Sequence, residues 1–136
     1  MKKSIKVLAF WVISILACTT FAKGQSYISE LKDFKTKIET ADKPLVVVFI
    51  APGWCVVSKR YMPIVNKVAK DYEGKFLLYY VDIDKCEEKL QSYVNIDGVP
   101  VTLFFKNGVV ENFHKSIGII KREELIKILK SEKFFE

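Results

Sequence analysis

The chain has few of the side chains that bind metal ions or cross-link small domains. Its 136 residues include one histidine, His114, and three cysteines, Cys18, Cys55 and Cys86. Three cysteines are too few for a scaffold held together by disulfides, and no cluster of Cys and His has the spacing of a metal site. We therefore expect no metal ion, no other cofactor, and a fold that depends on its hydrophobic core.

A concentrated block of charge is also lacking. The formal net charge is +6, from 22 basic and 16 acidic residues. Residues 1–22 contribute three of the basic residues and none of the acidic ones, so the rest of the chain carries about +3. The remaining charges form no block of like sign and no basic stripe, so we expect no nucleic-acid partner.

Residues 1–22 have the pattern of a secretory signal. Basic residues come first, an apolar run follows over residues 7–17, and small residues precede a cleavage site after Ala22. The run is short for a membrane span. We predict an exported protein, periplasmic or secreted, with residues 23–136 as one domain. Two alternatives stay open: lipidation of Cys18 after cleavage, or an uncleaved signal. Membrane anchoring is expected only through one of these.

Hydrophobic periodicity predicts an α/β domain. An amphipathic helix covers residues 28–38, with a short edge strand around Tyr27-Ile28 as an alternative for its start. The Asn107-Gly108 pair between two apolar runs predicts a hairpin. The other elements are strands at 45–50, 76–81, 101–105 and 109–113, and helices at 55–72, 87–93 and 121–130. This order predicts a central mixed sheet of four or five strands with helices on both faces.

The stretch most indicative of chemistry surrounds Cys55. The continuously apolar strand 45–50 ends in a turn, and Cys55 follows at the start of a helix. A helix N-terminus carries unpaired N–H groups and partial positive charge, which favour a thiolate. Ser58 stands where a second cysteine would complete a Cys-x-x-Cys pair. We predict that Cys55 is a nucleophile and that Ser58 donates a hydrogen bond to its sulfur.

Four local patterns in this order resemble the thioredoxin family over residues 26–129. They are Trp54-Cys55-x-x-Ser58-Lys59, the helix-interior Pro63, Val81-Asp82-Ile83-Asp84, and Gly98-Val99-Pro100 with the strand and hairpin that follow it. The resemblance implies a thioredoxin-like fold with a cis Val99–Pro100 bond beside Cys55. It also implies that Trp54, Val99, Pro100 and Gly118 line a groove for an extended client peptide.

Two positions depart from the family pattern. Ser58 replaces the resolving cysteine, and Phe49 stands where the family has a buried acid that assists that cysteine. The two losses are consistent with each other, because a buried carboxylate without a second thiol to serve would still carry a desolvation cost.

Two functions follow as hypotheses. In the first, Cys55 and Ser58 are the catalytic residues of monothiol thiol–disulfide exchange with exported clients, and release needs a client thiol, a small thiol or a reductant partner. Cys86 is not expected to resolve the disulfide, since its place in the fold lies beyond the Cα separation that a disulfide spans. In the second, the chain is a redox-inactive peptide-binding or chaperone-like module.

Overall fold

The computed structural model describes residues 26–135. The predicted signal, its cleavage after Ala22 and the alternative lipid on Cys18 lie outside the described residues. Within the described part, no helix is long and apolar enough to cross a bilayer. The element order matches the predicted one and runs α1 (Leu31–Glu39), β1 (Leu45–Ile50), α2 (Val56–Asp71), β2 (Leu77–Asp82), α3 (Glu88–Tyr93), β3 (Val101–Phe105), β4 (Phe113–Ile117) and α4 (Arg122–Ser131).

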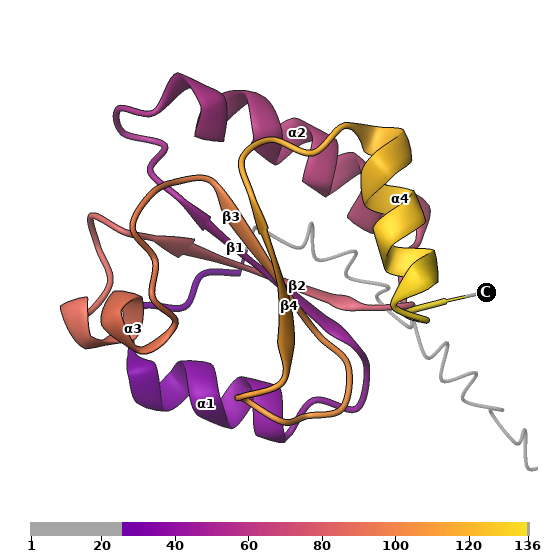
Figure 1. Ribbon diagram of the computed structural model, residues 1–136, viewed down its shortest axis with the longest axis horizontal. Helices are drawn as coiled ribbons and strands as arrows, with labels where there is room; N and C mark the ends of the chain where they lie inside the picture. Colours follow the sequence, from indigo (N-terminus) through magenta and orange to yellow (C-terminus); the bar gives the residue numbers. More distant parts are fainter. Residues whose placement is uncertain (1–25, 136) are drawn as a thin grey trace, which may run out of the picture.

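The strands form one mixed sheet in the order β2-β1-β3-β4. β1 pairs in parallel with β2 and antiparallel with β3, which pairs antiparallel with β4. Figure 1 shows α1 and α3 on one side of the sheet and α2 and α4 on the other. β1 is buried along its whole length, which explains its continuously apolar sequence. The predicted mixed sheet with helices on both faces is confirmed.

Alternate residues of β1 enter two separate hydrophobic clusters, one under each pair of helices. Val48 and Ile50 pack in the cluster that includes α2 and α4. Phe49 points the other way, into the cluster that includes α1 and α3. The helix that begins at the candidate nucleophile is therefore fixed to the sheet by its apolar face.

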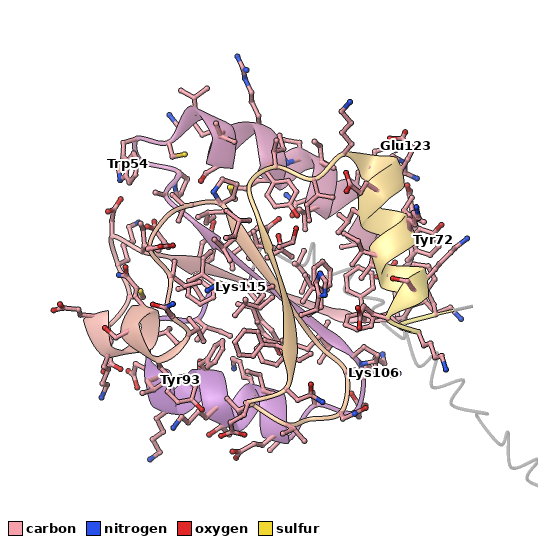
Figure 2. The ribbon with its side chains drawn as sticks, viewed as in Figure 1. Trp54, Tyr72, Tyr93, Lys106, Lys115 and Glu123 are labelled. Carbon is pink, nitrogen blue, oxygen red and sulfur yellow. The ribbon has the colours of Figure 1, made fainter. Side chains whose placement is uncertain are left out.

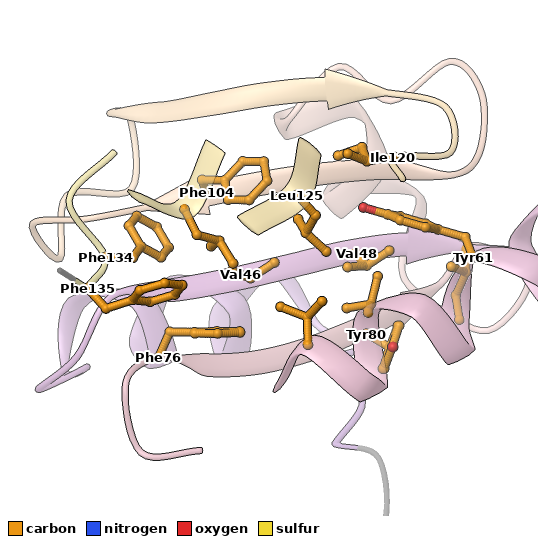
Figure 3. Packing of buried hydrophobic residues seen from close by; sticks show 14 residues of the cluster. Val46, Val48, Tyr61, Phe76, Tyr80, Phe104, Ile120, Leu125, Phe134 and Phe135 are labelled. Atoms are coloured by element: carbon orange, nitrogen blue, oxygen red, sulfur yellow. The ribbon is translucent and has the colours of Figure 1, made fainter. Parts of the chain in front are cut away.

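The C-terminal tail completes the cluster under α2 and α4. Phe134 and Phe135 are buried there, and Phe135 stacks on Tyr72 with ring centroids 4.2 Å apart. Figure 3 shows these two phenylalanines at one end of the cluster and Tyr61 and Tyr80 toward the other. The tail thus closes the end of the core farther from Tyr61.

The return strand of the hairpin lies further along the chain than predicted. The sequence favoured residues 109–113, whereas β4 spans Phe113–Ile117. The loop before β4 contains an additional turn, closed by a 3.2 Å hydrogen bond from the Asn112 N–H to the Val109 carbonyl. Val110 in this loop is buried in the α1–α3 cluster. Its apolar character therefore reflects core contact from a loop and not strand pairing.

α1 also begins later than its apolar spacing suggested. The stretch from Ser26 to Ile28 runs beside β2, where the Ile28 N–H donates to the Tyr80 carbonyl at 2.8 Å. This is the alternative edge strand, present as a single parallel bridge between Tyr27 and Tyr80. Ile28 is buried in the same cluster as the core-facing residues of α1. Its apolar side chain therefore fitted the helical spacing although it lies before the helix. Apart from α1 and β4, the predicted boundaries agree with the structure to within one residue.

Candidate functional site

Cys55 is the N-cap residue of α2. A turn after β1 positions it, because the Ala51 carbonyl accepts hydrogen bonds from the N–H groups of Trp54 (3.2 Å) and Cys55 (2.8 Å). The Cys55 backbone is extended, and its sulfur accepts a hydrogen bond from the Ser58 N–H at 3.4 Å. The sulfur therefore occupies the place where a helix N-terminus offers unpaired N–H groups.

These contacts favour the ionised form of the thiol. The Ser58 hydroxyl and then the Ser58 N–H lower the pKa of the Cys55 thiol, the Val57 N–H lowers it slightly further, and burial opposes them. Cys55 is half-buried, so its sulfur is stabilised by the helix start and still meets solvent. A thiol with these properties is suited to nucleophilic attack.

Ser58 is fully buried beneath Cys55. Its Oγ accepts a hydrogen bond from the Ala51 N–H at 3.2 Å, which leaves the hydroxyl proton free to be donated to the sulfur. The hydroxyl has no nucleophilic role toward sulfur at neutral pH, so the site holds one reactive thiol. Phe49 is also fully buried and packs edge-on against Phe34 with ring centroids 6.4 Å apart. An aromatic ring thus fills the position of the family's acid.

The loop before β3 meets the Cys55 sulfur. The Val99–Pro100 peptide bond is cis, and the Val99 carbonyl oxygen lies 4.0 Å from the Cys55 Sγ. Gly118 has a φ of +90°, and its N–H donates to the Pro100 carbonyl at 2.9 Å. These contacts connect Cys55 and Ser58 with Val99, Pro100 and Gly118.

The backbone N–H of Val99 is a donor that this loop offers beside the nucleophile. Among the described residues, no group accepts a hydrogen bond from the Val99 N–H. Val99 is half-buried beside the nucleophile, so this N–H is suited to pair with an extended chain that adds to the loop as a strand.

Exposed apolar side chains gather on the segments that form the site. Trp54 is 62% exposed, and Val56 and Val57 in the first turn of α2 are also exposed. Figure 2 shows Trp54 at the end of the molecule where α2 begins. Ile117 and Ile119 are exposed on both sides of Gly118. Neither isoleucine was predicted as a site residue, although their position beside Gly118 was a usable signal.

Cys86 belongs to another part of the molecule. It packs at the margin of the α1–α3 cluster, where the Gln91 side-chain amide donates to its sulfur at 3.5 Å. Burial raises the pKa of the Cys86 thiol. Both Cys55 and Cys86 are free thiols, and the structure shows no contact between them. Cys86 is thus the less reactive thiol of the two.

Known proteins are similar to this chain in sequence and in fold. The family model described as Thioredoxin matches residues 25–131. Chloroplastic thioredoxin M4 of Arabidopsis thaliana is 36% identical over 71% of this chain, which spans about half (48%) of M4. Thioredoxin C-2 of Corynebacterium nephridii is 32% identical over 69% of this chain and 83% of its own length. The structure of chloroplastic thioredoxin z has the same fold, with a TM-score of 0.71 at 19% identity, covering 80% of this chain and 94% of its own. The chain belongs to the thioredoxin family.

Proposed function

We propose that this protein carries out monothiol thiol–disulfide exchange through Cys55. The Cys55 thiolate attacks one sulfur of a client disulfide, a Cys55–client disulfide forms, and the other client sulfur leaves as a thiolate. The observation that carries the proposal is the Cys55 sulfur at the N-cap of α2, hydrogen-bonded by the Ser58 N–H at 3.4 Å. Because Ser58 cannot displace the client, release comes from a second client thiol, a small thiol or a reductant partner.

The clients in this proposal are exported proteins. The signal-like pattern of residues 1–22 supports export to the periplasm or the medium, with a lipid on Cys18 as the anchored variant. The Val99 N–H, which has no acceptor among the described residues, supports clients that present their cysteine in an extended segment. Such a segment places its sulfur near Cys55 while its backbone pairs with the loop.

The first test is the pH dependence of thiol alkylation by iodoacetamide. The full chain with Cys18→Ser is prepared with either Cys86→Ser or Cys55→Ser, so that each variant reports one thiol of the described domain. The rate follows the thiolate fraction, and a lowered pKa moves its rise to lower pH. We expect the rise for Cys55 below the ordinary cysteine value of about 8.5 and the rise for Cys86 above it. A Cys55 midpoint at or above the ordinary value contradicts the proposal.

A second candidate function rests on the exposed apolar side chains of Trp54, Val56 and Val57. These side chains would hold an extended apolar peptide whether or not a disulfide forms, as a peptide-binding or chaperone-like module does. In that case Cys55→Ala leaves the affinity for a cysteine-free extended peptide unchanged, measured by titration calorimetry, and Trp54→Ala weakens it. The binding-module hypothesis is wrong if neither the native chain nor Cys55→Ala binds such a peptide and cysteine-containing clients are retained only through a disulfide with Cys55.

A further inference from the structure

A hydrogen bond between two buried hydroxyls lies behind the site. The Tyr61 hydroxyl is 2.7 Å from the Thr102 Oγ1, and both residues have no exposed surface. Tyr61 is on α2, six residues after Cys55, and Thr102 is on β3, two residues after Pro100. The bond therefore links the helix that carries the nucleophile to the strand that follows the cis-proline loop.

This pair is unusual for its surroundings. Tyr61 belongs to a cluster that is otherwise mostly aliphatic and aromatic, as Figure 3 shows. A buried hydroxyl is costly unless it is hydrogen-bonded, and Val or Phe would fill the same space without that requirement. Burial raises the pKa of Tyr61 to about 12, so its hydroxyl keeps its proton. Each hydroxyl is thus the partner that the other needs.

A second tyrosine makes the same kind of contact elsewhere. The Tyr80 hydroxyl on β2 donates to the Asn66 side-chain oxygen on α2 at 2.6 Å. Both tyrosines therefore attach α2 to the sheet, Tyr61 to β3 and Tyr80 to β2. Only β3 follows the loop that contains Val99 and Pro100, so the two bonds differ in what they hold in place.

We propose that Tyr61 and Thr102 are positioning residues that fix the Cys55 thiol relative to the Val99 backbone for capture of an extended client. This inference rests on the proposed exchange through Cys55. A client needs both groups at once, and they come from different elements, α2 and the loop before β3. The 4.0 Å between the Cys55 Sγ and the Val99 carbonyl oxygen is the spacing that the buried bond maintains.

The test compares two disulfide substrates with the same leaving group. One is dithiobis-nitrobenzoate, which needs only the thiolate. The other is an extended peptide whose single cysteine forms a mixed disulfide with thionitrobenzoate. This peptide also needs the loop that contains Val99, because its backbone pairs there. In each reaction the Cys55 thiolate bonds to a substrate sulfur and thionitrobenzoate leaves as the coloured thiolate. Rates are measured on the full chain with Cys18→Ser and Cys86→Ser, so that Cys55 is its only cysteine.

In Tyr61→Phe and Thr102→Val we expect the peptide rate to fall about fivefold, the worth of roughly one hydrogen bond, while the small-reagent rate is unchanged. The double variant should lose no more than either single variant, and Thr102→Ser should retain the native ratio. Tyr80→Phe is the matched control, because it removes a buried hydroxyl that contacts α2 without involving β3.

The outcomes separate this inference from the proposed function. An equal fall of both rates, or the same change in Tyr80→Phe, shows a general effect on the fold and overturns the positioning role. Thr102→Val and Thr102→Ser decide the question if Tyr61→Phe does not fold. A slow native reaction with both substrates contradicts the exchange function itself, and the ratio of the two rates still reports on positioning.

Discussion

A Ser58→Cys variant is expected to release a disulfide-bound group from Cys55 at least about 100-fold faster than the native chain, because the second attack becomes intramolecular. The assay uses the full chain with Cys18→Ser and Cys86→Ser and one equivalent of dithiobis-nitrobenzoate, so that a second thionitrobenzoate can come only from the mixed disulfide on Cys55. The native site should release about one thionitrobenzoate per protein and stop at the mixed disulfide. In the variant, the introduced thiol attacks the Cys55 sulfur and expels a second thionitrobenzoate, so the yield approaches two.

The surroundings of Ser58 set the pH dependence of that second step. The side chain at this position has no exposed surface, and the Phe49 ring stands where the family has an acid. Burial without a nearby base raises the pKa of a thiol, so the second release should accelerate as the pH rises. Ser58→Ala is the control and should keep the yield near one. A yield near one for Ser58→Cys at alkaline pH would show that the introduced sulfur cannot reach Cys55.

The fold was predictable where one physical signal dominated the sequence. Residues 45–50 are apolar without interruption because β1 is covered on both faces. The return strand was not predictable in the same way. β4 lies at the edge of the sheet, and its residues are half-buried or exposed, so the burial pattern that marks a strand is weak there. The apolar Val110 follows the Asn107-Gly108 hairpin signal, and the return strand was therefore predicted too early in the chain.

The residues at and behind the site also differ in how far local sequence patterns indicate them. Cys55, Ser58 and Pro100 were predicted to lie together because each belongs to a short motif with a known geometry. The Tyr61–Thr102 bond joins residues 41 positions apart, and each residue alone fits an ordinary core or strand pattern. Only the register of β3 beside β1 and the packing of α2 bring the two hydroxyls together. Such pairs depend on tertiary contacts, which local sequence patterns do not encode.

A Phe49→Asp variant should be the most destabilising change at this site. It restores the side chain that the family has in this position, but here the ring is fully buried and packs on Phe34. We expect the free energy of unfolding to fall by about 4 kcal/mol, from lost packing and from burial of a carboxyl without a partner. Phe49→Leu keeps most of the apolar contact and should cost only about 1 kcal/mol. Urea denaturation followed by circular dichroism measures both.

The pH dependence of the free energy of unfolding distinguishes lost packing from burial of the carboxyl in Phe49→Asp. Burial raises the pKa of the introduced carboxyl in the folded state above its unfolded value of about 3.9. The unfolded chain then releases the proton first as pH rises, so stability falls with increasing pH above that value. We expect Phe49→Asp to be less destabilised, relative to Phe49→Leu, at pH 4 than at pH 7. If the difference in free energy of unfolding between Phe49→Asp and Phe49→Leu does not change with pH, the introduced carboxyl reaches solvent. In that case, packing around Phe34 would not explain why position 49 lacks a carboxylate.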